Sequence, residues 1–293
     1  MAQIIPAVTK LSNRVIRILG CNPGVMTLQG TNTYLIGSGK NRILLDTGEK
    51  DVKEYQLHLG TVLKKEQVNI EHIIITHWHQ DHIGGVDDLY GEIAKEPKVW
   101  KHKRSFDDDP EELPRKTPLN WLSDGQEFKV EGATVKVHHT PGHTTDHVAL
   151  TLIEEDTLFS GDCILGEGTA VFEDLYTYMK SLQRILDLNP HVIYPGHGNV
   201  IQDPTDRIKY YIAHRNQRET QILNALKENK GVKLNAMELV EQIYTETPEH
   251  LWAAAALNVT HHLKKLVKEK KIISTRVYGE PKWQFCGNID SNL

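Results

Sequence analysis

The sequence predicts an α/β fold followed by a smaller helical, winged-helix-like domain. Through roughly the first two hundred residues, short apolar segments typical of buried strands alternate with turns and a few helical stretches. From about residue 205 the spacing of apolar residues becomes helical. A chain of 293 residues is long enough for one large domain with an appendage. We therefore expect a large domain over residues 1–220 and a second domain over residues 221–293.

The elements of the large domain follow from this alternation. Helical spacing predicts helices over residues 51–66 and 174–188. The glycine-containing segment 37–41 is expected to be a hairpin turn, and the proline-rich, acidic segment 104–120 a surface loop. Strands are expected at residues 14–19, 33–36, 42–45, 71–76, 98–100, 127–130, 133–139, 147–153, 156–160 and 191–194.

The C-terminal part is expected to contain three helices and then a pair of strands. The helices are predicted over residues 205–229, 236–245 and 248–270, the second capped by Asn235. The strands are predicted at 272–278 and 282–286, with Gly279-Glu280-Pro281 as the turn. This order is typical of a winged-helix module, with plain helical packing as the alternative. The buried stripe of the third helix is expected to consist of Leu257, Leu263 and Leu266.

Composition narrows the classes of protein that the chain can belong to. The formal net charge is −5, and residues 206–273 hold 12 Lys+Arg and 8 Asp+Glu, so this segment carries +4 and the remainder −9. No stretch approaches the roughly 20 apolar residues that a membrane span needs, so we expect no membrane partner. Three cysteines without a CxxC pair favour a reducing, intracellular compartment.

The segment from His77 to His82, HWHQDH, is the strongest functional signal in the sequence. It places four potential metal ligands directly after the apolar run 73–75, which reads as a buried strand. His77 and His79, one residue apart, can project to the same side of the chain. Asp81 and His82 are expected to lie on a loop that curls back toward Gly84-Gly85. Such an array can hold two adjacent metal ions.

Three later segments each place one metal-binding side chain at the end of a predicted strand, beside a small turn residue. They are Pro141-Gly142-His143, Ser160-Gly161-Asp162 and Pro195-Gly196-His197. In α/β proteins, sites assemble at the carboxyl ends of strands. A single histidine beside a glycine is weak evidence, but four such segments together predict a two-metal site.

These residues resemble the metallo-β-lactamase superfamily, whose five motifs match in order over roughly residues 10–200. The resemblance implies an αββα sandwich with a dinuclear site along one edge. It implies that His77, His79 and His143 hold the first metal ion. It assigns the second ion to Asp81, His82 and His197, and makes Asp162 the ligand shared by both. Asp46 is then the acid that orients the ligand loop.

The ligand types indicate both the metal and the reaction. Imidazole and carboxylate ligands without a thiolate suit two Zn2+ ions, with manganese or iron as alternatives. We take Asp81, His82 and Asp162 as the catalytic set. Cys163 is expected to be a buried neighbour of the site and not a thiolate ligand. A bridging carboxylate points to hydrolysis of phosphodiesters or thioesters, and not to lactam opening.

The flanking segments 20–24 and 28–34 and the helical tail are similar to an animal branch of this superfamily, whose members are mitochondrial endoribonucleases. The resemblance implies single-stranded RNA as the substrate and a location in the mitochondrial matrix. Two metal ions would supply hydroxide at neutral pH, and its attack on phosphorus opposite the leaving 3′-oxygen would leave 3′-OH and 5′-phosphate ends. Candidate phosphate contacts are Asn199 and Thr144. Lysines of the last helix, represented by Lys264 and Lys268, are candidates for an electrostatic footprint on RNA. Turn capping and a solvated helix face are the alternatives for these residues.

Two other functions remain open from the sequence. A glyoxalase-II-type thioester hydrolase shares the metal motifs and a helical C-terminal domain. A nucleic-acid-binding adaptor would need a structural metal site, in which protein ligands occupy every coordination position. The complete ligand set found here matches a catalytic centre, which keeps open positions, and so argues against the adaptor.

Overall fold

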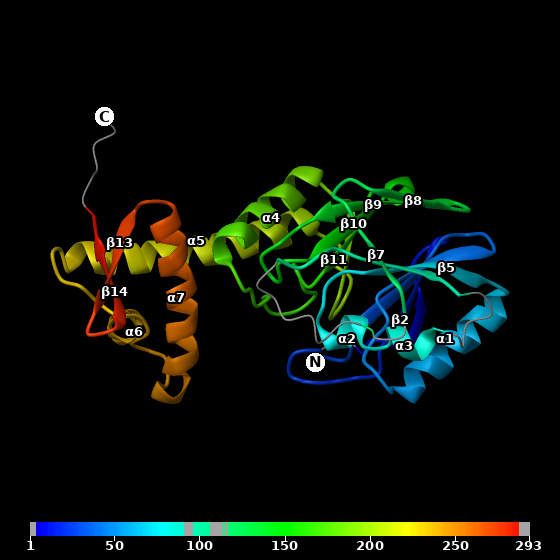
Figure 1. Ribbon diagram of the computed structural model, residues 1–293, viewed down its shortest axis with the longest axis horizontal. Helices are drawn as coiled ribbons and strands as arrows, with labels where there is room; N and C mark the ends of the chain where they lie inside the picture. Colours follow the sequence, from blue (N-terminus) through cyan, green and yellow to red (C-terminus); the bar gives the residue numbers. More distant parts are fainter. Residues whose placement is uncertain (1–3, 91–95, 106–113, 115–116, 287–293) are drawn as a thin grey trace.

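Two mixed β-sheets pack face to face in the N-terminal two thirds of the chain (Figure 1). The computed structural model describes residues 4–90, 96–105, 114 and 117–286. The first sheet is antiparallel from β1 to β4 and parallel from β4 to β7. Its strands, in spatial order, are β1 Val8–Lys10, β2 Val15–Leu19, β3 Asn32–Ile36, β4 Asn41–Leu45, β5 Asn69–Ile75, β6 Lys98–Lys101 and β7 Leu119–Trp121.

The second sheet has five strands in the order β12-β11-β10-β9-β8. Only the β11–β12 pair within it is parallel among the described strands. Its strands are β8 Glu127–Val130, β9 Ala133–His139, β10 Val148–Leu152, β11 Thr157–Gly161 and β12 Val192–Pro195. A short 3-10 turn, η2 Ile153–Glu155, connects β10 to β11.

The facing sides of the two sheets bury a common apolar core in which the rings of Tyr34, Phe159 and Tyr194 contact one another. Helices cover both outer faces and bury their apolar sides there. The first sheet is covered by α1 Lys53–Glu66, α2 Gln80–Ile83 and α3 Val86–Leu89. The second is covered by α4 Leu175–Leu188 and the first half of α5 Pro204–Glu228. The four layers are the predicted αββα sandwich.

The C-terminal residues form a winged-helix domain with its own core, as predicted. It contains α6 Ala236–Ile243, the 3-10 turn η3 Glu249–Leu251, α7 Trp252–Lys268, β13 Ile272–Val277 and β14 Glu280–Phe285. Asn235 caps α6 through a reciprocal capping box with Glu238.

Helix α5 belongs to both domains. Ile208 and Tyr211 in its first half pack against the second sheet, while Ile222 and Leu226 in its second half lie in the core of the winged-helix domain. Figure 1 shows this helix running from one domain into the other. Residue 220, where we expect the domain boundary, lies inside the helix.

None of the helices in the described ranges is long and apolar enough to cross a membrane.

Three local expectations are wrong. The last turn is formed by Tyr278 and Gly279, with φ of 50° and 86°, because a two-residue hairpin loop of this type needs positive φ at both positions. Pro281 therefore lies inside β14, opposite Arg276.

The end of the expected loop 104–120 forms β7, while most of that segment falls outside the described residues. Leu257 is 67% exposed, because it lies on the side of α7 that faces away from the domain core.

Candidate metal centre

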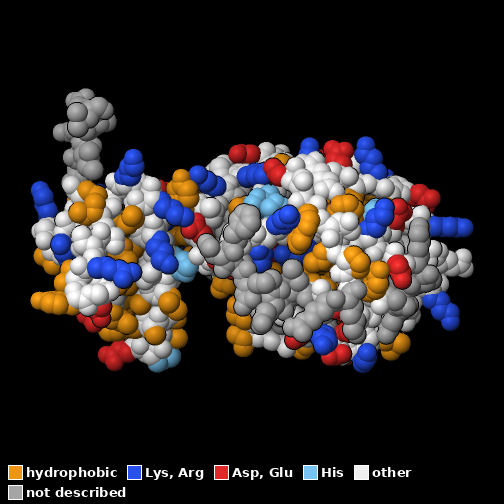
Figure 2. Space-filling model, in the orientation of Figure 1, with side chains coloured by type: hydrophobic (Ala, Val, Ile, Leu, Met, Phe, Trp, Pro, Cys, Tyr) orange, Lys and Arg blue, Asp and Glu red, His pale blue; other side chains and the backbone are white. Residues whose placement is uncertain are grey.

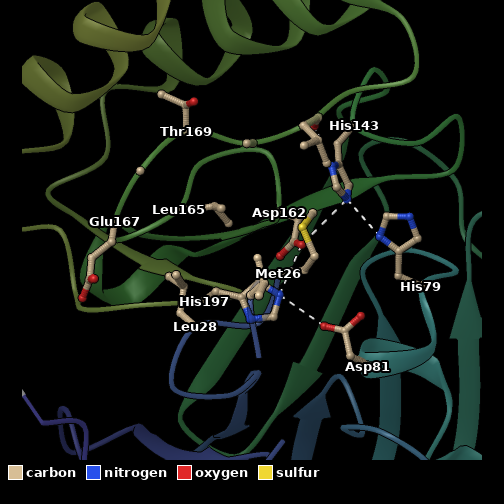
Figure 3. A pocket seen from close by; sticks show the side chains of 14 residues that line it. Met26, Leu28, His79, Asp81, His143, Asp162, Leu165, Glu167, Thr169 and His197 are labelled. Carbon is tan, nitrogen blue, oxygen red and sulfur yellow. Dashed lines mark hydrogen bonds and ion pairs between the residues drawn. The ribbon is translucent and has the colours of Figure 1, made fainter. Parts of the chain in front are cut away.

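Seven potential ligands converge at one edge of the sandwich, where strands of both sheets end. Figure 3 labels His79, Asp81, His143, Asp162 and His197 of this set. His77 and His79 follow β5, and His143 follows β9. Asp162 follows β11, and His197 follows β12. Asp81 and His82 lie on the short helix α2 and not on the loop that we expect. The helix forms because His79 and Gln80 accept backbone hydrogen bonds from residues 83 and 84.

The first ligand group consists of His77, His79 and His143, with Asp162 beside them. The Nε2 atom of His77 lies 2.9 Å from Nδ1 of His79, and Nε2 of His143 lies 3.2 Å from each of these nitrogens. Four ligands at about 2.0–2.1 Å from a tetrahedral zinc ion would be about 3.3 Å apart. The three nitrogens therefore have the spacing that a single ion requires.

The second group consists of Asp81, His82 and His197. Oδ2 of Asp81 lies 3.1 Å from Nε2 of His82 and 3.2 Å from Nε2 of His197. The two imidazole nitrogens are 3.3 Å apart. This group has the same spacing as the first.

Asp162 joins the two groups. Its Oδ2 lies 3.7 Å from Nε2 of His143 in the first group and 3.3 Å from Nε2 of His197 in the second. Its Oδ1 lies 3.4 Å from Nε2 of His82. Gly196 makes room for this carboxylate, because a Cβ at that position would collide with Oδ1 of Asp162. The arrangement matches a carboxylate shared between two ions.

Burial and the neighbouring carboxylates shift the pKa values of the ligand imidazoles in opposite directions. Burial, together with its imidazole neighbours, lowers the pKa of His77 well below its ordinary value, so the ring is neutral and can offer a lone pair. Burial also opposes the charged form of His197, but Asp162 overrides it and raises the pKa of His197 to about 9. Oδ1 of Asp162 is buried and accepts no hydrogen bond from the described residues. A cation between the two ligand groups would coordinate Oδ1 of Asp162 and take the place of the proton on the imidazole of His197.

Asp46 orients the ligands, in agreement with the role that the sequence suggests. Its Oδ2 accepts a hydrogen bond from Nδ1 of His82 at 2.7 Å, which leaves Nε2 of that ring facing the site. The same carboxylate accepts hydrogen bonds from the backbone and the hydroxyl of Thr76, at 2.8 and 2.9 Å. The Thr76 hydroxyl in turn lies 2.9 Å from Nδ1 of His77. Asp46 thus orients one ligand of each group.

His147 is a positioning residue that the sequence does not reveal. It is fully buried, and its Nε2 accepts a hydrogen bond from the backbone N–H of Asp162 at 3.1 Å. Nδ1 of the ring lies 2.9 Å from the hydroxyl of Thr140. Burial lowers the pKa of His147 well below its ordinary value, which keeps the accepting nitrogen unprotonated. A histidine at the start of an apolar strand is the signal that could have identified it.

Two further contacts on the ligands are also missing from the sequence prediction. The Thr31 hydroxyl donates to Oδ2 of Asp81 at 2.9 Å. Nδ1 of His143 donates to the backbone oxygen of Val171 at 2.8 Å. Both contacts join segments that are distant in the sequence, so no local motif announces them.

A pocket of about 280 Å3 opens above the ligands. One side is apolar and consists of Val25, Met26, Leu28 and Leu165 (Figure 3). Val25 and Met26 are 96% and 63% exposed, so they form a lip at the entrance. Within the described part of the chain, Glu167 is the ionisable side chain that this lining adds to the ligands, and it adds no lysine or arginine.

The two residues that we expect to contact phosphate near the site, Asn199 and Thr144, have different surroundings. Asn199 does not line the pocket, but its amide donates at 3.2 Å to the carboxylate of Glu167, which does. Thr144 is fully buried and does not line the pocket. Its hydroxyl therefore cannot reach a substrate there, which corrects our expectation. The side chain points away because His143, the preceding residue, is the one that faces the ligands.

The lysines of α7 are less available than their sequence suggests. Lys265 is buried and forms ion pairs with Glu219 and Glu269. Lys268 pairs with Asp174, the N-cap residue of α4, at 2.6 Å and so ties the two domains together. Lys264 is exposed. A continuous basic face on this helix is thus not present, because neighbouring acidic residues neutralise most of it.

Comparisons with known proteins agree with this geometry. Residues 26–197 match the metallo-beta-lactamase superfamily, and residues 236–283 match the beta-lactamase associated winged helix domain. A beta-lactamase-like protein 2 homolog of Drosophila melanogaster is 58% identical over 274 residues, which are 92% of this chain and 93% of that protein. The homolog of Caenorhabditis elegans is 50% identical over 264 residues, 89% of this chain and 87% of that protein.

More distant relatives carry other names. A protein of Claviceps purpurea named atrochrysone carboxyl ACP thioesterase is 37% identical over 286 residues, 95% of this chain and 88% of that protein. The crystal structure of a beta-lactamase domain protein from Burkholderia ambifaria has the same fold, with a TM-score of 0.80, 18% identity, and coverage of 97% of this chain and 96% of that one. The chain therefore belongs to the metallo-beta-lactamase superfamily, and it is a hydrolase of that superfamily with an associated winged-helix domain.

Proposed function

We propose that this protein is an endoribonuclease that uses two zinc ions to hydrolyse phosphodiester bonds within single-stranded RNA. The single observation that carries the proposal is the position of Asp162, whose carboxylate contacts both ligand groups. In the described part of the chain no cysteine belongs to either group. A pair of cations that share a carboxylate suits the in-line displacement of a phosphodiester, since both the attacking and the leaving oxygen need charge stabilisation.

When bound, the two ions would supply a hydroxide nucleophile at neutral pH and neutralise charge on the phosphate. The residues of the chain hold and orient this centre. Asp81 is fixed by the Thr31 hydroxyl, and Asp162 is fixed by His147 through its backbone N–H. The apolar lip beside the ligands limits access of bulk water. Attack opposite the 3′-oxygen leaves 3′-OH and 5′-phosphate ends, whereas a metal-independent ribonuclease leaves a cyclic phosphate.

A cation and an aromatic ring beside the first ligand group support RNA as the substrate. The guanidinium carbon of Arg104 lies 4.1 Å from the centre of the Trp78 ring, which is in contact with His79. Arg104 also lies 3.8 Å from a carboxylate oxygen of Glu173. Proteins that bind single-stranded nucleic acid combine cations with aromatic side chains on which bases can stack. The proposal includes the mitochondrial matrix as the place of action.

A thioester hydrolase is the second candidate, and the apolar lip is the observation that favours it. Val25 and Met26 are exposed at the entrance of a pocket whose described lining contains no lysine or arginine. An acyl chain would cover these residues. One fungal relative is named as a thioesterase acting on an acyl carrier protein, which makes this chemistry accessible to the same fold.

The test compares substrates directly. Zinc-loaded protein is incubated with end-labelled single-stranded RNA, duplex RNA and single-stranded DNA, and in parallel with lactoylglutathione and an acyl-coenzyme A. We expect internal cleavage of single-stranded RNA with 3′-OH ends, and loss of this activity in the Asp81→Ala/His82→Ala variant prepared in the same way. A 2′,3′-cyclic phosphate, or RNA cleavage that persists in that variant, would overturn the proposal. Thioester hydrolysis at rates far above RNA cleavage would establish the second candidate.

A further inference from the structure

A second cavity, of about 260 Å3, lies between the sandwich and the winged-helix domain. Figure 2 shows that the molecule narrows between these two domains. The segment 169–172 forms one wall of the cavity, and helix α7 forms the other. The side chains that characterise it are Phe172, Arg215, Ala254, Leu257, Asn258 and His261.

Arg215 is a buried cation with unused hydrogen-bond donors. It is 5% exposed, and its one hydrogen bond to the described residues runs from Nη2 to the backbone oxygen of Ala170 at 2.9 Å. Nε is buried and has no acceptor there. A guanidinium carries five N–H donors, and burying them unpaired costs free energy. The site is therefore incomplete without an acceptor.

The charge of Arg215 is also not neutralised by a carboxylate of the described residues. Its surroundings are aromatic: the guanidinium carbon lies 4.8 Å from the centre of the Phe172 ring. Lys265, another buried cation, has Glu219 and Glu269 as partners. Burial lowers the pKa of Arg215, as expected for a charge without a counterion. A buried arginine that faces a cavity in this state favours an anionic ligand.

The cavity shares a wall with the metal pocket. Thr169, Ala170 and Val171 line both. Arg215 binds the backbone oxygen of Ala170, and His143 donates to the backbone oxygen of the next residue, Val171. In Figure 3, Thr169 and His143 lie along the same side of the pocket. The two cavities therefore adjoin across the segment 169–171, and a strand of repeating anions that occupies the metal pocket would reach Arg215 by passing over this segment.

We infer that the interdomain cavity is an anion subsite in which Arg215 binds a phosphate of the RNA strand next to the phosphodiester being cleaved. This inference rests on the proposed function. Arginine binds phosphate through two parallel N–H donors, which would use the donors that the protein leaves free. The winged-helix domain then contributes to the site by closing the cavity with α7.

Ala254→Glu tests the subsite without altering Arg215. Ala254 is exposed and lines the cavity, while Ala253 is exposed and absent from its lining, so Ala253→Glu is a control with the same charge on the same helix. The measurements are KM for a 20-nucleotide single-stranded RNA at several salt concentrations, and KM for bis(p-nitrophenyl) phosphate, which is small enough to fill the metal pocket alone.

For Ala254→Glu we expect KM for the RNA to rise roughly tenfold and the salt dependence of log KM to weaken by about 0.7, the contribution of one phosphate contact on a single strand. KM and kcat for bis(p-nitrophenyl) phosphate should be unchanged, and Ala253→Glu should behave as the wild type. The same RNA-specific loss is expected for Arg215→Lys, which keeps the charge but not the two parallel donors.

Four results would overturn the inference. Equal effects of the two glutamate variants on RNA would show that α7 repels RNA generally. A parallel loss on both substrates in Arg215→Lys would show that the residue merely positions the segment 169–171. If wild-type protein cleaves RNA and Ala254→Glu leaves KM for the RNA unchanged, the proposed subsite is contradicted while the proposed function stands. If wild-type protein does not cleave RNA, both are wrong.

Discussion

Asp162 is the side chain through which the two ligand groups depend on each other. We expect Asp162→Asn to reduce hydrolysis of bis(p-nitrophenyl) phosphate by more than about 100-fold, since replacing even a residue that only orients a ligand costs 10- to 100-fold. Metal content, measured by mass spectrometry, should fall below two ions per chain. Cys163→Ala is the control, because Cys163 is buried beside the site but belongs to neither group.

That control also distinguishes the carboxylate from the thiol. Burial raises the pKa of the Cys163 thiol, which keeps it protonated and unsuited to bind metal. Loss of a metal ion in Cys163→Ala with normal stability would contradict our assignment of the ligands.

His147 should act on the metal centre without touching the ions. Replacing it by leucine leaves the backbone N–H of Asp162 without its acceptor, so the shared carboxylate loses its fixed direction. We expect His147→Leu to weaken metal affinity by roughly 10- to 100-fold. The measurement is competition with a chelator. His138→Leu is the matched control, since His138 is also buried but bonds to Thr151. Equal affinities in the two variants would contradict this role.

The ligands could be predicted from the sequence because four of them follow one apolar strand within the segment 77–82, and His143, Asp162 and His197 each follow a glycine at the end of another strand. Their partners could not. His147 contacts Asp162 across 15 positions, and Thr31 contacts Asp81 across 50. These distances depend on how strands of two sheets end at one edge, which no local pattern encodes. Thr144 was assigned wrongly for a related reason: its neighbour His143 faces the site, so Thr144 itself points into the protein.

At the scale of the element, helix α7 shows how neighbouring lysines differ. Lys265 is buried with two carboxylates, whereas Lys264 is exposed. We expect Lys265→Met to lower the free energy of unfolding by about 2 kcal/mol, because it removes a hydrogen-bonded charged partner of Glu219 and leaves only Lys271, 3.2 Å from that carboxylate, in the described residues. Lys264→Met should change it by less than about 0.5 kcal/mol. Urea unfolding followed by circular dichroism measures both, and equal effects would show that the buried pair adds no stability.

Most elements follow from apolar periodicity, and the exceptions have local causes. Strand β9 has the predicted bounds, 133–139. Strand β7 was missed because three residues at the edge of a sheet carry too little pattern. Helical spacing predicts Leu257 in the core, because the spacing identifies an apolar stripe along a helix but not how many neighbouring positions the core covers. In the structure, Leu257 lines the interdomain cavity.

At the scale of the whole molecule, metal binding should contribute to stability. The centre gathers Asp46, Asp81 and Asp162 around buried imidazoles, and a cation bound only by the folded state stabilises it. With free zinc about 1,000-fold above Kd, the gain is about 4 kcal/mol. We expect removal of metal by a chelator to lower Tm by roughly 10 °C, since each kcal/mol corresponds to about 2–4 °C in a protein of this size. Calorimetry measures the shift.

Readdition of zinc should restore the original Tm, while magnesium should not, because imidazole ligands suit zinc and not magnesium. The Asp162→Asn variant provides the control, as its Tm should respond less to the chelator. An unchanged Tm after complete removal of metal would show that the centre is already stable through its own hydrogen bonds.

The two-domain organisation could be predicted from the change of periodicity near residue 205, but the way the domains share α5 could not. Both halves of the helix have ordinary helical spacing, and only the packing of Tyr211 on one core and Leu226 on the other shows that the helix serves both.

Helix α5 also sets an order of events during synthesis. The chain emerges from the ribosome with the strands of the sandwich and then α4, but the covering of the outer face of the second sheet is complete only when Ile208 and Tyr211 have been translated. The metal ligands are complete at His197, a few residues earlier. The nascent centre therefore acquires all its ligands before its supporting layer is complete, and a release just after residue 197 would leave the second sheet covered by α4 alone.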